Sequence, residues 1–574
     1  MKPTFTRHYP HWPPARPRSL SLPRTSVYAN LEASARREPG DCALDYYGNR
    51  IPYAELRRQV DALAGFLQGR LGIERGDRVL LYTQNSPQYV IGYYAILRAD
   101  AVVVPVNPMN RTEEIRHYLE DAGARVMIAT QELWGEIAPL LGTSGLTHVI
   151  LGAYSDYLSA DHLAVDQGSA DRGPGPSGLP VPEFVRAPRQ AISVPGVTAF
   201  AEAVAAGLVP REHLARDHDL AVMPYTSGTT GRAKGCIHTH LSVQATASAI
   251  GAWRGDARQS VVLAVLPLFH VTGMQSGMNT PLQLGSTIVL MTRWDRDCAA
   301  RLVERTRVTT LTAITTMMVD FLANPDLDRY DLSSLSWVGG GGAAMPEAVA
   351  RLLEARIGLP YIEGYGLSET MAPTHFNPTQ RPKRQCAGIP MFDVDARVLD
   401  PETFGERGPM EIGEIVLHGP QLFQGYWKNP AATEEAFLQH DGKRFFRTGD
   451  LGYYDEDGYF FITDRLKRMI NAAGFKVWPA EVEALLYAHP DIQEACVIAS
   501  RDPYRGETVK AVIVPRPEAS GHLRGEDITT WARGRMAAYK VPRIVEFVAE
   551  LPKTASGKIL WRQLQEDENR RLTP

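Results

Sequence analysis

The stretch YTSGTTGRAKG occupies residues 225–235 and directly follows the short apolar run LAVMP at residues 220–224. Between Thr226 and Gly231 every residue is a glycine or carries a hydroxyl group, and Lys234 adds a positive charge. Glycine lets the backbone turn tightly and bring its N–H groups close to a ligand. Hydroxyl groups and a lysine provide further donors for phosphate oxygens. The stretch therefore predicts a phosphate-binding loop at the end of a buried strand.

A Walker A loop is the first alternative, because it also binds phosphate after a strand. It requires the pattern G-x-x-x-x-G-K-[ST]. Gly228 and Gly231 are too close together for that pattern, and Lys234 is followed by Gly235. The sequence thus excludes a Walker A site, and an ordinary polar turn does not account for so strong a bias in composition.

Short apolar runs alternate with amphipathic stretches over most of the chain. This alternation is typical of an α/β protein with stacked layers and largely parallel sheets. Residues 112–123 are expected to form a helix that Asn110 or Thr112 caps. Residues 153–195 are rich in glycine, proline and serine, and we expect a surface loop or insertion there. The other expected elements are strands at 78–84, 101–106, 125–130, 220–224 and 286–291 and a helix at 87–99.

The pattern changes near residue 464, where a strand is followed by a charged joint and a glycine-containing loop. The part after this joint is about 100 residues long, which is enough for a small α+β domain. We therefore expect the domain boundary at 464–468. The expected elements beyond it are strands at 494–500, 507–515 and 542–550 and a helix at 526–538.

Length and composition limit the class of protein. The chain has 574 residues, too many for one compact domain, and its 44% apolar and 22% charged content is typical of a globular protein. The formal net charge of −4 excludes a general polyanion binder, so we expect no nucleic-acid partner. Five cysteines without CxxC spacing indicate a reducing, cytoplasmic compartment and argue against a disulfide framework or a structural zinc site.

Residues 1–30 form a basic, proline-rich arm. No acidic residue precedes Glu32, as in a transit peptide, but six prolines within the first 23 residues oppose the amphipathic helix that such a peptide needs. The arm lacks the apolar core of a secretory signal, and no run reaches the roughly 18 apolar residues of a membrane span. We expect an extended arm on the domain surface and no membrane span.

Further motifs follow the phosphate-binding stretch in a definite order. They are GGGGAAMP at 339–346, YGLSET at 365–370, RTGD at 447–450, DRLKRMI at 464–470 and PKTASGKILW at 552–561. Together with YTSGTTGRAKG, this ordered set resembles the AMP-forming adenylate ligases, the superfamily of acyl-CoA synthetases, luciferases and peptide-synthetase adenylation units. The resemblance covers roughly residues 225–562, and the earlier part of the chain matches mainly in its α/β alternation.

The resemblance implies a two-domain architecture. A large AMP-binding N-terminal domain of stacked α/β layers would span residues 31–463, and a small, mobile α+β lid domain would span residues 469–574. The joint at 464–468 would be the hinge between them, with Lys467 as its pivot.

The resemblance also assigns roles to individual residues. By it, Tyr365 lies on the adenine, Ser368 contacts phosphate and Glu369 helps to hold Mg²⁺. Asp450 accepts both ribose hydroxyl groups, which suits a carboxylate with two acceptor oxygens, and Lys558 is the adenylation lysine. The implied nucleotide-binding residues are Thr226, Ser227, Gly228, Thr229, Thr230, Gly231, Lys234, Gly341, Ala343, Tyr365, Gly366, Ser368, Asp450 and Arg465, and the implied catalytic residues are Lys558, Glu369 and His270.

The acyl site is less well defined by the sequence. By the resemblance, His270 in PLFHVTGM is a wall of this site that gates access of the carboxylate, although an isolated histidine of this kind is more often a packing residue. Seven of the fifteen methionines lie between Met274 and Met371, where they suit either an adaptable apolar tunnel or an ordinary core. The small residues at 339–342 would leave room for a bulky or long acyl group.

The implied activity is a two-step ligation. A carboxylate attacks the α-phosphate of ATP and gives an acyl-adenylate and pyrophosphate, and the thiol of coenzyme A then takes the acyl group. The stretch YGLSETMAPTHFNP, from residue 365, most resembles medium- or long-chain fatty acyl-CoA synthetases. The expected partners are therefore a carboxylic acid, ATP with Mg²⁺, and CoA.

Several alternatives stay open. An aryl or dicarboxylic acid could replace the fatty acid, and a separate carrier protein could replace CoA. A luciferase-type oxygenase shares the adenylation step. A non-catalytic sensor is disfavoured because Glu369, Asp450 and Lys558 are all in place. Peripheral membrane contact and the oligomeric state, including a homodimer, are not decided by the sequence.

Overall fold

The computed structural model describes residues 4–159, 179–226, 233–255, 259–342, 344–472, 475–477, 479–502, 506–553 and 559–571. The chain divides into two compact units. Unit 1 comprises Met1–Thr4, His8–Asp395 and His418–Phe446, and unit 2 comprises Phe5–Arg7, Ala396–Leu417 and Arg447–Pro574. The predicted hinge at 464–468 lies within unit 2, and its role as a domain boundary stays a prediction.

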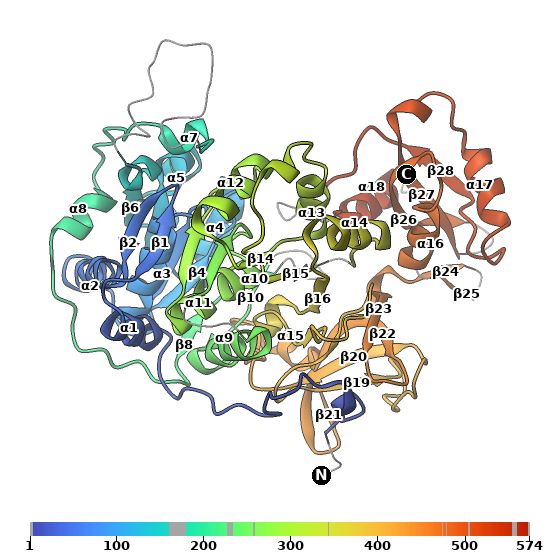
Figure 1. Ribbon diagram of the computed structural model, residues 1–574, viewed down its shortest axis with the longest axis horizontal. Coiled ribbons are helices and arrows are strands. Elements are labelled where there is room, and N and C mark those ends of the chain that lie inside the picture. The colour runs from blue at the N-terminus through green and yellow to red at the C-terminus, as the bar shows by residue number, and fades with distance from the viewer. Residues whose placement is uncertain are drawn as a thin grey trace. The chain divides into compact units, whose positions relative to one another are not determined.

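The first sheet of unit 1, to which the labelled strands β3, β4, β6 and β8 of Figure 1 belong, has seven strands in the order β11-β8-β4-β3-β5-β6-β7. All neighbours pair in parallel except β11 with β8. Nearly every residue of the central strands is buried, as expected for a parallel sheet covered on both faces. The strands are β3 (Arg78–Tyr82), β4 (Val102–Pro105), β5 (Val126–Thr130), β6 (His148–Gly152), β7 (Val197–Ala199), β8 (Leu220–Val222) and β11 (His238–Thr239).

The second sheet of unit 1 has nine strands in the order β18-β17-β16-β15-β14-β12-β13-β1-β2. Its run from β1 to β16 is parallel, and β2, β17 and β18 add antiparallel edges. The strands are β1 (Cys42–Tyr46), β2 (Asn49–Pro52), β12 (Val261–Ala264), β13 (Thr287–Leu290), β14 (Thr310–Thr312), β15 (Trp337–Gly341), β16 (Tyr361–Tyr365), β17 (His375–Phe376) and β18 (Ile389–Pro390).

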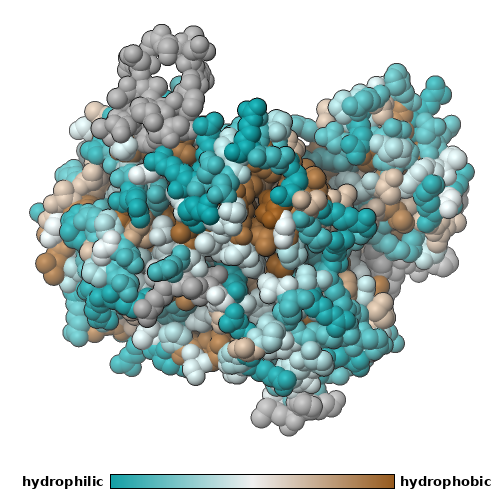
Figure 2. Space-filling view, viewed as in Figure 1, coloured by the Kyte–Doolittle hydropathy of each residue, from teal (hydrophilic) through white to brown (hydrophobic). Residues whose placement is uncertain are grey.

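Helices between the strands cover both sheets, and most of them share one large apolar core, whereas α4 and α5 pack in a second apolar cluster on the seven-stranded sheet. Figure 2 shows apolar side chains gathered between α12 and α13 on the face in view, within a largely hydrophilic surface. The helices of unit 1 are α1 (Tyr28–Arg37), α2 (Tyr53–Gly69), α3 (Pro87–Arg98), α4 (Thr112–Ala122), α5 (Trp134–Ile137), α7 (Glu183–Arg186), α8 (Phe200–Ala205), α9 (His240–Arg254), α10 (Val271–Met274), α11 (Thr280–Leu284), α12 (Arg296–Thr306), α13 (Thr315–Leu322), α14 (Glu347–Ile357) and α15 (Pro430–Glu435).

The sequence predicted the fold class correctly, and the five strands and two helices that it named in this unit are all present, but the cap of α4 was predicted wrongly. The N-cap residue is Arg111, whose backbone N–H donates to Glu114 Oε2 at 2.8 Å. Thr112 is not the cap, because its hydroxyl group donates to Glu136 Oε2 at 2.7 Å, and Asn110 lies one residue before the cap. A tertiary contact thus displaced the local capping preference.

The segment predicted as a loop or insertion, 153–195, is described only at its two flanks. These flanks contain the short helices η4 (Tyr154–Tyr157) and α7, and they bury Tyr154 and Val185 in the core. The described ends of the segment are therefore part of the packed domain.

Unit 2 has its own mixed sheet in the order β25-β24-β27-β26, with β28 pairing in parallel with β27. The long strand β22 crosses the boundary between the units: its first residues pair with β21 in unit 1 and its last residues pair with β23 in unit 2. The elements of unit 2, given together with β21 of unit 1, are β19 (Asp395–Leu399), β20 (Gly413–His418), β21 (Phe437–His440), β22 (Lys443–Tyr454), β23 (Phe460–Arg465), β24 (Ile470–Ala472), β25 (Phe475–Val477), α16 (Pro479–Leu486), β26 (Ile492–Asp502), β27 (Gly506–Pro515), α17 (Gly525–Arg533), β28 (Ile544–Phe547) and α18 (Trp561–Arg571).

A buried ion-pair network fastens α18 to this sheet. Lys510 Nζ on β27 lies 2.5 Å from Glu568 Oε2 on α18 and 2.7 Å from Glu546 Oε2 on β28. Ser500 donates a hydrogen bond to Glu568 at 2.7 Å. Buried charges of this kind are tolerated only while they are paired.

All five cysteines are buried and free. Among the helices that the structure describes, none combines the length and the apolar character needed to cross a membrane.

Replacing Lys510 by methionine is expected to lower the free energy of unfolding by about 3–5 kcal/mol, because it leaves the buried carboxylate of Glu568 without its cation. The double variant Lys510→Met/Glu568→Leu removes both charges and should recover most of that loss. Equilibrium urea unfolding measures both changes. An equal loss in the single and the double variant would show that the ion pair is not its source.

Candidate active site

The two ends of the predicted phosphate-binding loop form a short antiparallel ladder. β9 (Tyr225–Thr226) pairs with β10 (Lys234–Gly235), and Thr226 lies opposite Lys234. The structure thus brings together the two ends of the loop. Its predicted members Ser227, Gly228, Thr229, Thr230 and Gly231 lie outside the described residues.

Helix α4 supports both ends of this ladder. The Tyr225 hydroxyl group donates to Asp121 Oδ2 at 2.6 Å, and the Tyr225 ring stacks on Tyr118 with centroids 4.3 Å apart. Burial and the bond to Asp121 raise the pKa of Tyr225, so its hydroxyl group stays a donor. On the other side, His117 Nε2 donates to the carbonyl oxygen of Ala233 at 2.9 Å. Helix α4, which was predicted only as part of the α/β alternation, therefore holds the two described ends of the loop.

Tyr426 joins the end of this loop to the predicted metal ligand. Lys234 Nζ lies 5.1 Å from the centre of the Tyr426 ring, within the range of a cation–π contact. The Tyr426 hydroxyl group donates to Glu369 Oε1 at 2.9 Å. Burial and the charge of Glu369 raise the pKa of Tyr426, which keeps this proton on the phenol. The sequence analysis missed Tyr426, whose only signal was an aromatic pair after Gly425.

Backbone hydrogen bonds hold Tyr426 at this position. Gly425 accepts from Ile237 N at 3.0 Å, and Trp427 N donates to the carbonyl oxygen of Gly235 at 2.8 Å. Phe423 N donates to the carbonyl oxygen of Glu369 at 2.8 Å. The chain around Tyr426 is thus paired both with the strand after the loop and with the turn that carries Glu369.

The turn after β16 carries the predicted residues Tyr365, Gly366, Ser368 and Glu369 next to one another. A Cβ atom on Gly366 would lie 2.8 Å from the Cα of Pro373, so only glycine fits there. The carbonyl oxygen of Ser368 accepts a hydrogen bond from His238 Nε2 at 2.8 Å. Burial lowers the pKa of His238 to about 4, so the neutral ring donates this bond at pH 7.

The glycines of β15 are required by packing. A Cβ atom on Gly340 would lie 2.1 Å from the carbonyl oxygen of Ala313 and 2.6 Å from the Tyr361 hydroxyl oxygen. A Cβ atom on Gly341 would lie 2.3 Å from the carbonyl oxygen of Gly364. Packing alone therefore accounts for these glycines, and the room they would leave for an acyl group stays a prediction. Ala343 lies outside the described residues.

Glu363 on β16 is a second residue that the sequence analysis missed. Its side chain is 6% exposed and accepts hydrogen bonds from Met345 N at 2.7 Å and Cys386 N at 2.6 Å. Burial raises the pKa of Glu363 to about 7. The carboxyl group thus connects the strand that carries Tyr365 to the segment that follows the glycines of β15.

His270 is half-buried and forms the N-cap of α10, where its Nδ1 accepts a hydrogen bond from Thr272 N at 3.3 Å. Its gating role stays a prediction. Of the seven methionines between Met274 and Met371, all but Met317 are buried members of the large core, and Met317 packs against it. Their positions fit core filling.

In unit 2, the structure brings together Asp450 and Arg465. They are cross-strand neighbours on β22 and β23, and Arg465 Nε lies 2.7 Å from Asp450 Oδ1. The backbone N–H of Asp450 donates to the Thr448 hydroxyl oxygen at 3.0 Å. Lys467 lies in the short helix η8 (Leu466–Arg468), and Lys558 lies outside the described residues.

Comparison with known proteins gives consistent matches along the whole chain. The family described as AMP-binding enzyme matches residues 31–427, and the AMP-binding enzyme C-terminal domain matches residues 481–558. A long-chain-fatty-acid–CoA ligase of Bacillus subtilis (strain 168) is 35% identical over 560 residues, which cover 96% of each chain. A feruloyl-CoA synthase of an Amycolatopsis species is 35% identical over 530 residues, 92% of this chain and 96% of that protein.

Solved structures with the same fold include an ATP-bound form of MatB from Rhodopseudomonas palustris. It has a TM-score of 0.80 at 27% identity and covers 96% of this chain and 100% of its own. A fatty acyl CoA synthetase of Mycobacterium tuberculosis has a TM-score of 0.71 at 26% identity, with 95% and 99% of the two chains covered.

The crowding around Gly340 predicts a large cost for any side chain. Gly340→Ala is expected to lower the free energy of unfolding by about 1–3 kcal/mol, the usual cost of overpacking. Gly135→Ala on α5 is the matched control, because its Cβ atom would meet nothing within 4 Å. That control should be neutral or stabilise by about 0.4–1 kcal/mol. Similar losses in both variants would contradict the packing argument.

Glu363 predicts a specific pH dependence of stability. Its pKa rises on folding from an ordinary value of 4.5 to about 7, so the folded chain holds its proton more tightly. The resulting stabilisation is present below pH 4.5 and is lost as the pH rises through 7. Relative to Glu363→Gln, the wild type should therefore lose roughly 3 kcal/mol between pH 4.5 and 8. Equilibrium urea unfolding across this pH range measures the difference in the free energy of unfolding between the two proteins. A difference that does not change with pH would contradict the raised pKa of Glu363.

Proposed function

The chain belongs to the AMP-binding enzyme family, and we propose that it is an AMP-forming acid–thiol ligase that makes acyl-CoA from a carboxylic acid, ATP and CoA. The observation that carries the proposal is the convergence of Lys234 and Glu369 on Tyr426. Through this tyrosine, the cation at the end of the predicted phosphate-binding loop is linked to a buried carboxylate. A bound nucleotide needs a cation for its phosphates and a carboxylate for its metal counter-ion.

The first step is attack of the substrate carboxylate on the α-phosphate of ATP, which forms the acyl-adenylate and releases pyrophosphate. Both reactants are anions, so the step requires alignment and a positive field more than covalent help. In our proposal Lys234 and the N–H groups of the loop at 226–234 supply this field. Lys558 adds a further charge, as the resemblance implies.

Mg²⁺ fits the donor set around Glu369. The ion prefers one or two carboxylates together with phosphate oxygens, and Glu369 is a largely buried carboxylate that Tyr426 holds in place. In our proposal Glu369 holds the ion, which would neutralise charge on the phosphates when bound.

The remaining nucleotide contacts are proposed residue by residue. Tyr365 covers the adenine, Ser368 and Thr226 contact phosphate, and Asp450 accepts the ribose hydroxyl groups. Arg465 is the cross-strand partner of Asp450, so it would also orient that carboxylate.

The second step is attack of the CoA thiol on the carbonyl carbon of the adenylate, which forms the thioester and releases AMP. In our proposal His270 forms a wall of the acyl site, and Lys467 is the pivot of a movement between the two steps. A cytoplasmic location, peripheral membrane contact and a homodimer stay predictions that rest on the sequence alone.

The proposed substrate is a medium- or long-chain fatty acid. The relative named long-chain-fatty-acid–CoA ligase supports it, and so do the apolar side chains between α12 and α13 (Figure 2). An aryl acid is the second candidate, because the relative named feruloyl-CoA synthase is equally similar at 35% identity.

Pyrophosphate release tests the proposal, measured with ATP, Mg²⁺ and acids from acetate to palmitate, together with ferulate, benzoate and adipate, each with and without CoA. We expect CoA-dependent release that is greatest with a medium- or long-chain acid and is lost in Lys558→Ala. Tyr426→Phe keeps the ring next to Lys234 but removes the bond to Glu369. It should lower kcat/KM by about 10- to 100-fold, the usual value of a hydrogen bond to a charged group.

Each other outcome has a defined meaning. Greatest release with ferulate would favour the aryl acid, and release that CoA does not enhance would point to a carrier protein as the acceptor. The absence of release with every acid would contradict the ligase proposal, and ATP binding would then support a nucleotide sensor.

A further inference from the structure

The N-terminal arm has no role in the proposed function. Its described part in unit 1, residues 8–27, precedes α1 and contacts the rest of that unit at several points. At two of these points several contacts together fasten the arm. One fastening lies at its end, near Ser26. The other lies at the short helix η1 (Tyr9–His11) and Trp12.

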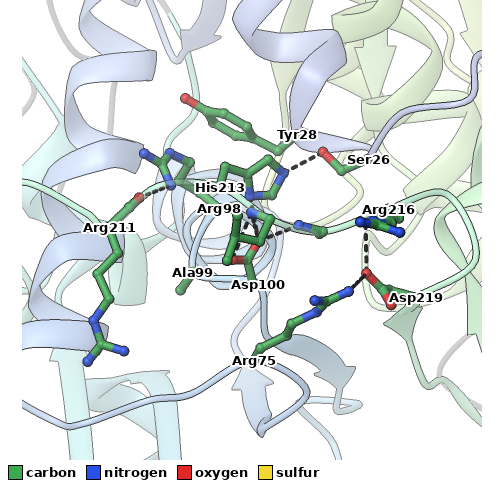
Figure 3. A network of polar contacts seen from close by, with 12 residues as sticks. Ser26, Tyr28, Arg75, Arg98, Ala99, Asp100, Arg211, His213, Arg216 and Asp219 are labelled. Carbon is green, nitrogen blue, oxygen red and sulfur yellow. Dashed lines mark hydrogen bonds and ion pairs between the residues drawn. The ribbon is translucent and has the colours of Figure 1, made fainter.

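The fastening at Ser26 is a polar network (Figure 3). Ser26 Oγ lies 2.6 Å from His213 Nε2, and His213 Nδ1 lies 2.7 Å from Asp100 Oδ1. A serine, a histidine and an aspartate in this order also make up the catalytic triad of serine hydrolases. Ser26 is only 3% exposed, however, so it is closed to a substrate and the network serves as an anchor.

Two further contacts strengthen this anchor. Val27 N donates to His240 Nδ1 at 3.0 Å, and the carbonyl oxygen of Ser26 accepts a hydrogen bond from Gln244 at 3.1 Å. Burial lowers the pKa of His240 to about 4, so its ring remains a neutral acceptor at pH 7. The end of the arm is therefore fixed to α9.

The fastening at Trp12 is aromatic. The Trp12 ring meets Trp253 and Phe392 edge to face, with centroids 5.1 and 5.3 Å away. Next to it, the His11 carbonyl oxygen accepts from Gln380 at 3.3 Å, and Arg381 donates to His11 Nδ1 at 2.6 Å. The arm thus contacts the segment that leaves β17.

From Trp12 a short chain of contacts leads to the strands of the nucleotide site. Trp253 Nε1 donates to the carbonyl oxygen of Asn377 at 3.1 Å, and Asn377 N donates to the carbonyl oxygen of Glu363 at 2.9 Å. Glu363 lies two residues before Tyr365 on β16.

A second route passes through β17. The ring of His375 lies 5.7 Å from that of Tyr365, and the cross-strand neighbour of His375 is Pro390, two residues before Phe392. Two separate ring contacts of Trp12, with Trp253 and with Phe392, therefore lead to the strands beside Tyr365.

We propose that the arm segment 8–12 is a positioning element of the nucleotide site, which sets Tyr365 through Trp253, Asn377 and His375. The inference rests on the proposed adenine contact of Tyr365. It assigns no arm residue to the chemistry, so the arm affects the binding of ATP and leaves the acid site unchanged.

The full-length variant Trp12→Ala tests this inference. We expect KM for ATP to rise by about two- to tenfold, the range that loss of an aromatic contact gives. KM for the acid should stay within about twofold of the wild type. Trp134→Ala is the matched control, because Trp134 is also half-buried but packs against the seven-stranded sheet. It should lower stability without changing KM for ATP, and Trp12→Phe should restore most of the ATP affinity.

Hydrogen exchange separates failure of this inference from failure of the proposed function. Amides at 361–377 should exchange faster in Trp12→Ala than in wild type and Trp134→Ala, whether or not the enzyme turns over. If Trp12→Ala does not fold, His8→Ala is measured in the same way, because the His8 ring lies 5.8 Å from that of Trp12. Unchanged KM for ATP with unchanged exchange at 361–377 would overturn the positioning role. Faster exchange in a protein that binds no ATP would instead overturn the proposed nucleotide site.

Discussion

Burial of Glu363 is the constraint on which the structure around Tyr365, the proposed adenine contact, depends. A carboxyl group leaves water at a high cost unless it is hydrogen-bonded or protonated. Two backbone N–H groups from separate segments, those of Met345 and Cys386, meet this need. The same two bonds tie the segment after β15 and the segment before β18 to β16. A single side chain thus holds together the surroundings of Tyr365.

Close packing imposes the complementary constraint on the neighbouring strand. β15 lies so near to β14 and β16 that a methyl group at Gly340 or Gly341 would overlap a carbonyl oxygen. Glycine there is a condition for the parallel sheet to form, before any ligand is considered. A glycine-rich motif can therefore be required by ligand binding, by the packing of the sheet or by both. The sequence alone does not distinguish these reasons.

The elements that were predicted correctly are those whose signal is local. The apolar runs of β3, β4 and β5 and the amphipathic period of α4 are contained within a few residues. Tyr426 and Glu363 were missed because their partners are distant in sequence. Tyr426 reaches a carboxylate 57 residues away, and no periodicity links the two. The prediction of the α4 cap failed for the same reason, because Glu136 on another helix accepts the hydrogen bond from the hydroxyl group of Thr112.

Tyr426 gives both charges of the site a neutral partner. A direct ion pair between a lysine and a glutamate would cancel much of the field of each and would have to be broken before a ligand could use either. A tyrosine can present its ring face to the cation and its hydroxyl proton to the carboxylate. The raised pKa of Tyr426 keeps that proton in place, so the residue adds no charge of its own. Lys234 and Glu369 thus share one neutral partner, which leaves both side chains available for the phosphate oxygens and the divalent cation of the proposed function.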